Sequence, residues 1–276
     1  MAEAPTVSQT GEPPGETHVV VDPILQVRGV TLKFGGVSAL TGVTFEVYPG
    51  QLLALIGPNG AGKSSLINCM NGVYHPQQGE ILLDGQALTG MSPPETVRAG
   101  IGRTFQNLAL FVNLNVYDNL MLGRHHLMRT GAVRGALWFG RARREEVEHR
   151  RRCAEIIEFL DLGAYRYLPV GMLPYGIQKR VELGRALAME PRVLLLDEPV
   201  AGMNREEVED MARHLMEIRD GVGCTTILVE HQLDLVMDLA DQVAVLDFGV
   251  LVAKGDPDAV RADPRVVAAY LGGSDQ

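Results

Sequence analysis

The sequence has no long hydrophobic run and no surplus of positive charge. No apolar stretch among its 276 residues approaches the roughly 20 residues that span a bilayer, and the longest, such as Leu52–Ile56 and Val193–Leu196, have the length of a strand. The formal net charge is −9. Binding to nucleic acid needs a basic footprint, and attachment to anionic lipid by charge alone needs one too. The sequence therefore predicts no membrane-spanning helix and no nucleic-acid partner.

Cysteine is scarce, and the N-terminal segment lacks an apolar centre. Cys69, Cys153 and Cys224 lie far apart, form no metal-ligand pair and have apolar neighbours, which predicts buried, reduced thiols. Met1–Thr17 is polar, rich in Pro, Gly and Glu, and does not resemble a signal peptide. We therefore expect a disordered tail over residues 1–22 and a cytoplasmic protein.

Strand and helix patterns alternate along most of the chain. Runs of β-branched, aromatic and other apolar residues predict strands at Ile24–Phe34, Val43–Tyr48, Leu52–Ile56, Glu80–Leu83, Val193–Leu196, Thr225–Val229 and Gln242–Leu246. Helical spacing and capping residues predict helices at Lys63–Asn71, Ser92–Ala99, Asn115–Met128, Arg141–Leu160, Asn204–Arg219 and Leu233–Ala240. Such alternation predicts an α/β fold with a mainly parallel sheet covered on both faces. Because no strand pattern appears between Gln106 and Val193, we expect a helical subdomain at about 107–190, inserted in the α/β core.

A glycine-rich segment fits the pattern G-x-x-x-x-G-K-[ST] of a phosphate-binding loop. It follows a predicted strand and opens a predicted helix, as this motif requires, and a chance match in a chain of this length is expected on the order of 1% of the time. Glycines let backbone N–H groups face phosphate oxygens, Lys63 supplies a positive charge, and Ser64 supplies a hydroxyl for Mg²⁺. The residues expected to bind ATP here are Gly57, Pro58, Asn59, Gly60, Ala61, Gly62, Lys63, Ser64 and Ser65.

Two carboxylates follow the apolar strand Val193–Leu196. A buried strand can deliver Asp197 to the phosphate loop, where it would hold Mg²⁺ directly or through water. Glu198, one residue further, can act as the general base that polarises the attacking water. Alone, the pair could equally be a solvated turn; together with the phosphate loop, we favour the catalytic interpretation.

Further segments resemble the motifs of the ABC ATPase family. Leu173–Arg180 resembles the signature motif, Thr104–Asn107 the glutamine loop, Val200–Asn204 the D-loop and Val229–His231 the switch-histidine segment. The resemblance covers almost the whole chain. It implies a P-loop NTPase cassette at 23–272 with N-terminal antiparallel strands and the inserted helical subdomain, followed by a tail at 273–276.

The resemblance also implies roles for single residues. Phe34 would stack on adenine, although a core residue at a strand end is the alternative. Gln106 would contact Mg²⁺ and the attacking water, and His231 would donate to the γ-phosphate. Tyr175 and Gly176 would bind the ATP of a partner subunit, because the helix that starts there directs N–H groups across a dimer. The catalytic set is then Glu198, His231, Gln106 and Lys63, and the Mg²⁺ set is Ser64, Gln106 and Asp197.

One subfamily matches most closely. Phe34–Val37, Arg103–Gln106, Ala201–Asn204, Ala269–Gly272 and the Gly-rich insert around Gly131–Gly140 resemble the high-affinity branched-chain amino acid importer ATPases. Relatives that handle urea, amides or lipopolysaccharide share much of this pattern. The resemblance implies an ATPase with ATP and Mg²⁺ as cofactors, on the cytoplasmic face of the membrane. Its partners would be a second identical or paralogous ATPase, two permease subunits and, indirectly, a solute-binding protein.

Two other functions compete with transport. Soluble ABC ATPases that act on DNA or ribosomes usually carry two cassettes or long coiled coils, whereas this chain has one cassette and a negative charge. A regulatory module without turnover would not need both Glu198 and His231. We therefore expect the energy-supplying subunit of an importer.

The signature segment has Pro174, Tyr175, Gly176 and Ile177 where the common motif has Ser-Gly-Gly-Gln, and of these departures the tyrosine is familiar in the subfamily. Proline offers neither a hydroxyl nor a backbone N–H, so one contact to the γ-phosphate is expected to be missing. We predict a weaker half-site, or a partner subunit with a fuller signature. Asn204 in place of the usual D-loop aspartate is a milder change.

Some residues admit two interpretations at this stage. Leu108–Phe111 could receive a coupling helix or join the core, and Trp138 with Phe139 could be core or docking surface. The charged run Arg141–Arg152 is expected to be a solvated helix face. The histidines form no metal cluster and are expected at solvated helix positions; they are His125, His126, His149 and His214.

Overall fold

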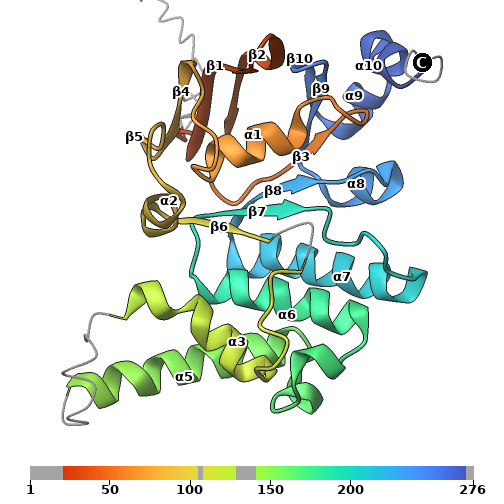
Figure 1. Cartoon of the computed structure of the whole chain (residues 1–276). Helices are drawn as coiled ribbons and strands as arrows, with labels where there is room; N and C mark the ends of the chain where they lie inside the picture. The colour runs from red at the N-terminus through yellow and green to blue at the C-terminus, as the bar shows by residue number, and fades with distance from the viewer. Residues whose placement is uncertain (1–20, 105–107, 129–140, 272–276) are drawn as a thin grey trace, which may run out of the picture.

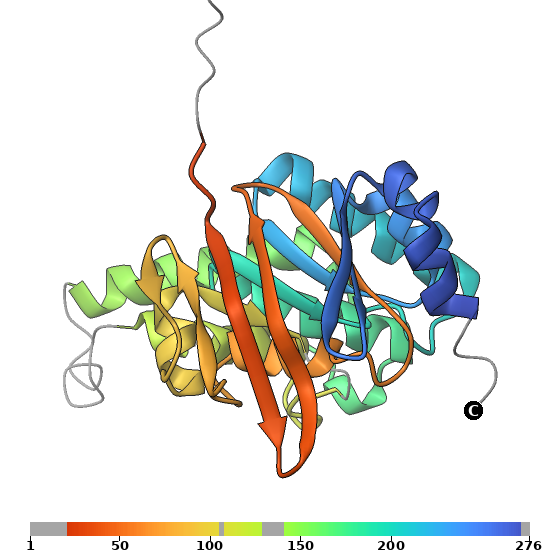
Figure 2. The ribbon, with the colours of Figure 1, turned by 90° about the horizontal axis from the view of Figure 1, so that it is seen from above.

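The computed structural model describes residues 21–104, 108–128 and 141–271. Two sheets and a layer of helices are stacked, with α1 (Lys63–Met70) between the sheets, as Figure 1 shows. Seen from above in Figure 2, the hairpin of β1 (Leu25–Phe34) and β2 (Val37–Val47) lies nearest the viewer, over the core sheet.

The core sheet has six strands in the order β10-β9-β3-β8-β7-β6. Neighbours from β9 to β6 are parallel, and only β10 is antiparallel, paired with β9. The smaller sheet is antiparallel, in the order β2-β1-β4-β5. These arrangements confirm the predicted fold class. The remaining strands are β3 Leu52–Ile56, β4 Gln78–Leu83, β5 Gln86–Ala87, β6 Ile101–Arg103, β7 Val193–Asp197, β8 Thr225–Val229, β9 Gln242–Asp247 and β10 Val250–Gly255.

The helices gather in two places. Figure 1 shows α3 (Val116–Gly123), α5 (Arg141–Phe159) and α6 (Tyr175–Ala188) packed together below the core sheet, and these three contact one another. The others flank the strands: α2 Pro93–Ala99, α7 Arg205–Glu217, α8 Leu233–Leu239, α9 Pro257–Arg261 and α10 Pro264–Leu271. Short helical turns follow α3, precede α6 and follow α7: η1 His125–Leu127, η2 Gly163–Tyr165, η3 Val170–Met172 and η4 Ile218–Val222.

Capping residues fix where several helices begin. Asn115 accepts a hydrogen bond from the backbone N–H of Asp118 at 2.7 Å, as the sequence predicts. Asn204 forms a capping box with Glu207 at the start of α7. Beyond α7 the chain stays helical past the predicted end at Arg219. The chain continues through η4 to Gly223, whose φ of 65° makes it the left-handed terminator.

The sequence patterns missed several elements. Strand β2 begins at Val37, six residues before the predicted start, because Leu40 is the one buried residue among its first six and these residues carry no apolar pattern. Strand β6 is only three residues long, too short for a period to be read. The strand β10 and the helices α9 and α10 were not predicted; β10 is largely half-exposed and carries little of the pattern of a buried strand.

Two apolar clusters occupy the two faces of the core sheet. One joins one face of the sheet to α3, α5, α6 and α7, and the other joins the opposite face to α1 and the antiparallel sheet. The three cysteines are free and buried, as predicted, and burial raises the thiol pKa of Cys69 to about 12 and of Cys153 and Cys224 to about 11. Within the described residues, no helix has the length and apolar character needed to cross a membrane.

Two histidines contradict the prediction of solvated positions. His149 and His214 are buried, because α5 and α7 turn these side chains towards neighbouring helices. Arg124 Nε donates to His149 Nδ1 at 2.8 Å. Among the described side chains of the charged face of α5, ion pairs form at the surface as expected, for example Arg150–Glu146 one turn apart.

We expect His214 to make stability pH-dependent. Burial is the main cause that lowers the pKa of His214, and neither ring nitrogen has a hydrogen-bond partner. Because the folded pKa lies below the unfolded value of about 6.5, the unfolded chain binds more protons once pH falls below 6.5, and stability decreases there by up to about 1.4 kcal/mol per pH unit. The charged groups around it are Arg213 and Glu217 on its own helix, Asp161 and Arg180.

Denaturant unfolding at pH 7.0 and 5.5 would measure this effect. The variant His214→Leu should show a smaller loss of stability between the two values than the unmodified chain. His75→Leu, at an exposed position, is the matched control and should leave the loss unchanged. Identical pH dependence in His214→Leu and in the unmodified chain would contradict the prediction.

Candidate functional site

The phosphate-loop motif forms a turn between β3 and α1. Gly57, Gly60 and Gly62 have φ values of 146°, 79° and 103°, which side chains rarely adopt. A Cβ on Gly57 would also collide with the carbonyl oxygen of Leu246, and a Cβ on Gly62 would lie 2.6 Å from the carbonyl oxygen of Ala39. The close approach of backbone therefore requires glycine at both positions.

Lys63 is the first residue of α1, and its ammonium lies over the loop. Its Nζ donates to the carbonyl oxygens of Gly57 at 2.7 Å and Pro58 at 3.0 Å. Burial lowers the pKa of Lys63, and the carboxylates of Glu198 and Asp197 act in the opposite direction. A desolvated ammonium among carbonyls gains strongly from an anionic phosphate, so this arrangement suits a nucleotide.

Glu198 and His231 face the loop from the ends of β7 and β8. His231 Nε2 and Glu198 Oε1 are 2.9 Å apart. Both residues line a cavity of about 310 Å³ with most of the loop. The structure thus brings together residues from three distant segments that the sequence assigned to one site. The residues that the sequence assigned to this site and that line the cavity are Asn59, Gly60, Ala61, Gly62, Lys63, Ser64, Ser65, Glu198 and His231.

Asp197 is buried beside this cavity and pairs with a residue that the sequence did not assign. Its Oδ2 is 3.0 Å from Arg103 Nη2, and the Arg103 Nη1 donates to Asn68 Oδ1 at 2.6 Å. The backbone N–H of Asp197 also lies 3.4 Å from Thr104 Oγ1. The sequence analysis named Arg103 only as part of the segment Arg103–Gln106, which resembles one subfamily. It gave no sign that Arg103 pairs with Asp197.

Glu230 is a second residue that the sequence left without a role. It is buried, and its carboxylate accepts hydrogen bonds from the backbone N–H groups of Val200 at 3.3 Å and His231 at 3.0 Å. Burial raises its pKa. Glu230 therefore fixes the backbone of the switch-histidine segment to that of the D-loop segment.

The remaining predicted ligands lie away from the phosphate cavity. Phe34 is 47% exposed and packs edge-to-face on Tyr74, with ring centroids 5.0 Å apart, so a face remains for a flat base. Tyr175, at the start of α6, is also partly exposed, whereas Gly176 is buried against Glu207. Gln106 lies outside the described residues, as do Trp138 and Phe139.

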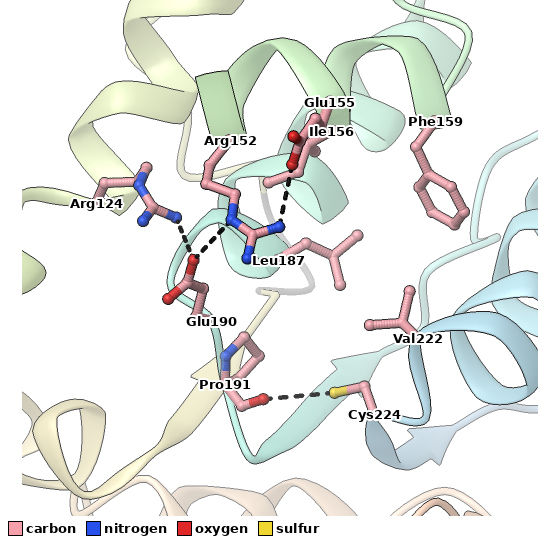
Figure 3. Close-up of a pocket in the computed structure, with 10 residues that line it drawn as sticks. All are labelled: Arg124, Arg152, Glu155, Ile156, Phe159, Leu187, Glu190, Pro191, Val222 and Cys224. Carbon is pink, nitrogen blue, oxygen red and sulfur yellow. Dashed lines mark hydrogen bonds and ion pairs between the residues drawn. The ribbon is translucent and has the colours of Figure 1, made fainter. Parts of the chain in front are cut away.

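A separate cavity of about 510 Å³ lies between α5, the end of α6 and η4. Figure 3 shows that its charged groups pair with one another: Glu190 contacts Arg124 at 3.0 Å and Arg152 at 3.7 Å. Arg152 also pairs with Glu155 at 3.0 Å. None of the residues predicted for ATP lines this cavity, and its ion pairs tie α3 and α5 to the loop after α6.

A strand, a loop that fits the phosphate-binding pattern and a helix, faced by an acidic strand end and a histidine, define a phosphate-loop nucleotide-binding domain. The model of the family "ABC transporter" matches residues 40–201, and that of "Branched-chain amino acid ATP-binding cassette transporter" matches residues 250–276. The chain belongs to the ABC transporter ATP-binding family.

Named relatives and solved structures agree with this assignment. The chain is 38% identical to the high-affinity branched-chain amino acid transport ATP-binding protein BraF of Pseudomonas aeruginosa, over 91% of this chain and 98% of the relative. It is equally similar, with the same coverage, to LivG of Escherichia coli. Its fold matches a nucleotide-free ATP-binding cassette from an ABC transporter with a TM-score of 0.78 and 32% identity, over 90% of this chain and 99% of that one.

Proposed function

We propose that the chain hydrolyses ATP to ADP and phosphate and thereby drives transport through separate membrane subunits. The observation that carries this proposal is the cavity in which Glu198 and His231 face the phosphate loop. Glu198 would accept the proton of the attacking water. His231 would donate to the γ-phosphate, and Lys63 and the loop N–H groups would neutralise the charge that develops there.

The oxygen donors near the loop suit Mg²⁺. The hydroxyl of Ser64 and the carboxylate of Asp197 are hard oxygen ligands of the kind that Mg²⁺ prefers, and Asp197 is buried, close enough to Lys63 for the two charges to interact. Gln106 completes the proposed set. Bound there, the cation would supply charge compensation for the phosphates; the residues themselves orient ATP and move the proton.

The transport substrate proposed is a branched-chain or related amino acid. The relatives BraF and LivG are named for branched-chain amino acid transport, and the C-terminal family match points the same way. Urea, amides or another small solute are the alternative. In this role the chain would work at the cytoplasmic face of the membrane with a second ATPase subunit, two permeases and, indirectly, a solute-binding protein.

A groove beside α3 supports docking of a permease. A cavity of about 440 Å³ is lined by residues of α2, α3, η1 and α6 together with Asn71, Arg103 and Phe111, and Phe111 is 56% exposed. Leu110, its neighbour, packs against the core. The apolar segment Leu108–Phe111 is thus divided, and Phe111 is the part available to a coupling helix.

Co-purification from native membranes tests this function. The tagged chain should recover multi-span permeases, identified by mass spectrometry, and the variant Phe111→Asp should lose them while it still binds ATP. An accompanying solute-binding protein would indicate the cargo. Recovery of ribosomes or DNA-repair proteins in place of permeases would exclude the proposed role in transport and leave only the proposed ATPase activity.

The signature segment leads to a further prediction. Pro174 is the N-cap of α6 and makes no side-chain cap. Since a serine N-cap stabilises a helix start by about 1 kcal/mol and adds a hydroxyl donor, Pro174→Ser should raise turnover in the assembled dimer several-fold. Site occupancy and phosphate release would be measured together. Equal, full hydrolysis at both sites of the unmodified dimer would contradict the idea of a weak half-site.

A further inference from the structure

Arg103 and Asp197 form a buried ion pair beside the phosphate site. They are the last residues of β6 and β7, which are parallel neighbours. Arg103 Nη2 lies 3.0 Å from Asp197 Oδ2, and the two side chains are 9% and 4% exposed. A carboxylate without a partner would be strongly unfavourable in such a place, so the guanidinium compensates the charge of Asp197.

The same guanidinium is tied to the helix that carries the phosphate loop. Its Nη1 donates to Asn68 Oδ1 at 2.6 Å, and Asn68 lies on α1. Arg103 therefore connects the elements that carry two of the three proposed Mg²⁺ ligands, Ser64 on α1 and Asp197 on β7. Because a guanidinium is planar and donates through separate N–H groups, the two contacts together hold it in one place.

A divalent cation and this guanidinium would both bind the carboxylate of Asp197. Mg²⁺ takes oxygen ligands at about 2.0–2.1 Å in octahedral geometry. Two cations at one carboxylate oxygen repel each other, and the repulsion is larger where water is excluded. A metal that binds Asp197 Oδ2 directly and Arg103 at hydrogen-bond distance from the same atom would therefore be competitors.

We propose that Arg103 is a positioning residue that neutralises Asp197 in the nucleotide-free chain and must leave its carboxylate to admit the cation that accompanies ATP. This inference rests on the proposed function, which assigns Asp197 to Mg²⁺. Arg103 holds the buried carboxylate in a fixed orientation between turnovers. It also raises the cation concentration at which the site loads, so that the metal binds well only when nucleotide phosphates add their own negative charge.

Manganese binding measures this competition without relying on turnover. Mn²⁺ is titrated, with detection by electron paramagnetic resonance, into the full chain saturated with a non-hydrolysable ATP analogue. In Arg103→Gln the Kd for Mn²⁺ should fall about tenfold, whereas affinity for the analogue in EDTA should stay unchanged. Arg103→Lys keeps the charge and should restore a Kd close to that of the unmodified chain. A residue that merely supports the fold would leave the Kd unchanged or raise it.

A second variant covers the case in which Arg103→Gln does not fold. Asn68→Ala removes one contact of the guanidinium and leaves both charges in place, so Arg103 should leave the carboxylate more easily and the Kd for Mn²⁺ should again fall. An unchanged or raised Kd in the folded variants overturns the inference.

The variant Asp197→Asn separates the inference from the function on which it rests. If Asp197→Asn leaves Mn²⁺ binding intact, the metal is held elsewhere and the metal assignment of the proposed function fails together with the inference. If Asp197→Asn abolishes Mn²⁺ binding while Arg103→Gln leaves the Kd unchanged, the metal site stands and the role of Arg103 is wrong.

Discussion

Replacing Glu198 by Gln is expected to lower ATP turnover by about 10²–10⁴-fold, the contribution typical of a positioned general base. The amide is nearly the same size and keeps a contact to His231, whose Nε2 lies 2.9 Å from Glu198 Oε1. It cannot take the proton of the attacking water. Phosphate release would be measured in the assembled dimer, and the Kd for ATP should remain within about twofold of the original value, because Glu198 does not belong to the loop that cradles phosphate.

Glu209→Gln is the matched control for this substitution. Glu209 is an exposed carboxylate on α7 that pairs only at the surface with Arg205, so its loss should leave turnover unchanged. If Glu198→Gln retained turnover within a few-fold of the unmodified protein, another group would have to be the base, and the assignment of Glu198 would be wrong.

Replacing Lys63 by Ala should weaken ATP binding by about tenfold to a hundredfold, since a hydrogen bond to a charged group contributes about 1.5–3 kcal/mol. The ammonium of Lys63 is already desolvated and is held by the carbonyl oxygens of Gly57 and Pro58. Burial lowers its pKa, so a phosphate that contacts it relieves an unfavourable charge as well as adding a contact.

Equilibrium binding of a fluorescent ATP analogue would measure the effect. Lys33→Ala, at an exposed position on β1, should bind the analogue normally and controls for the loss of one positive charge. Binding by Lys63→Ala that matched this control would mean that the loop N–H groups alone hold the phosphates.

The site could be predicted from the sequence wherever its residues are contiguous. Gly57–Ser64 is one contiguous segment, so its spacing of glycines, lysine and serine could be read directly from the sequence. Glu198 and His231 lie far apart in the chain, and family resemblance linked them before the parallel pairing of β7 and β8 brought them together.

Pairings that depend on tertiary structure could not be predicted. Arg103 and Asp197 are separated by 94 residues in the chain, and β6, which delivers Arg103, is too short to carry a period. The burial of His149 and His214 depends on which face of each helix meets its neighbours, and a histidine in a charged stretch gives no sign of it. The fold class was predictable because a strand–helix alternation suffices for it.

Strand β3 has a consequence for how the molecule unfolds. Leu52, Ala54 and Ile56 belong to one apolar cluster, and Leu53 and Leu55 belong to the other. The strand cannot detach without opening both, so its amides should exchange with solvent only through global unfolding. The phosphate loop follows this strand directly. Nucleotide affinity and the stability of the whole chain are therefore coupled. A substitution that creates a cavity among the helices below the sheet should destabilise β3 and thereby weaken nucleotide binding. Bound nucleotide should in turn stabilise those helices against unfolding.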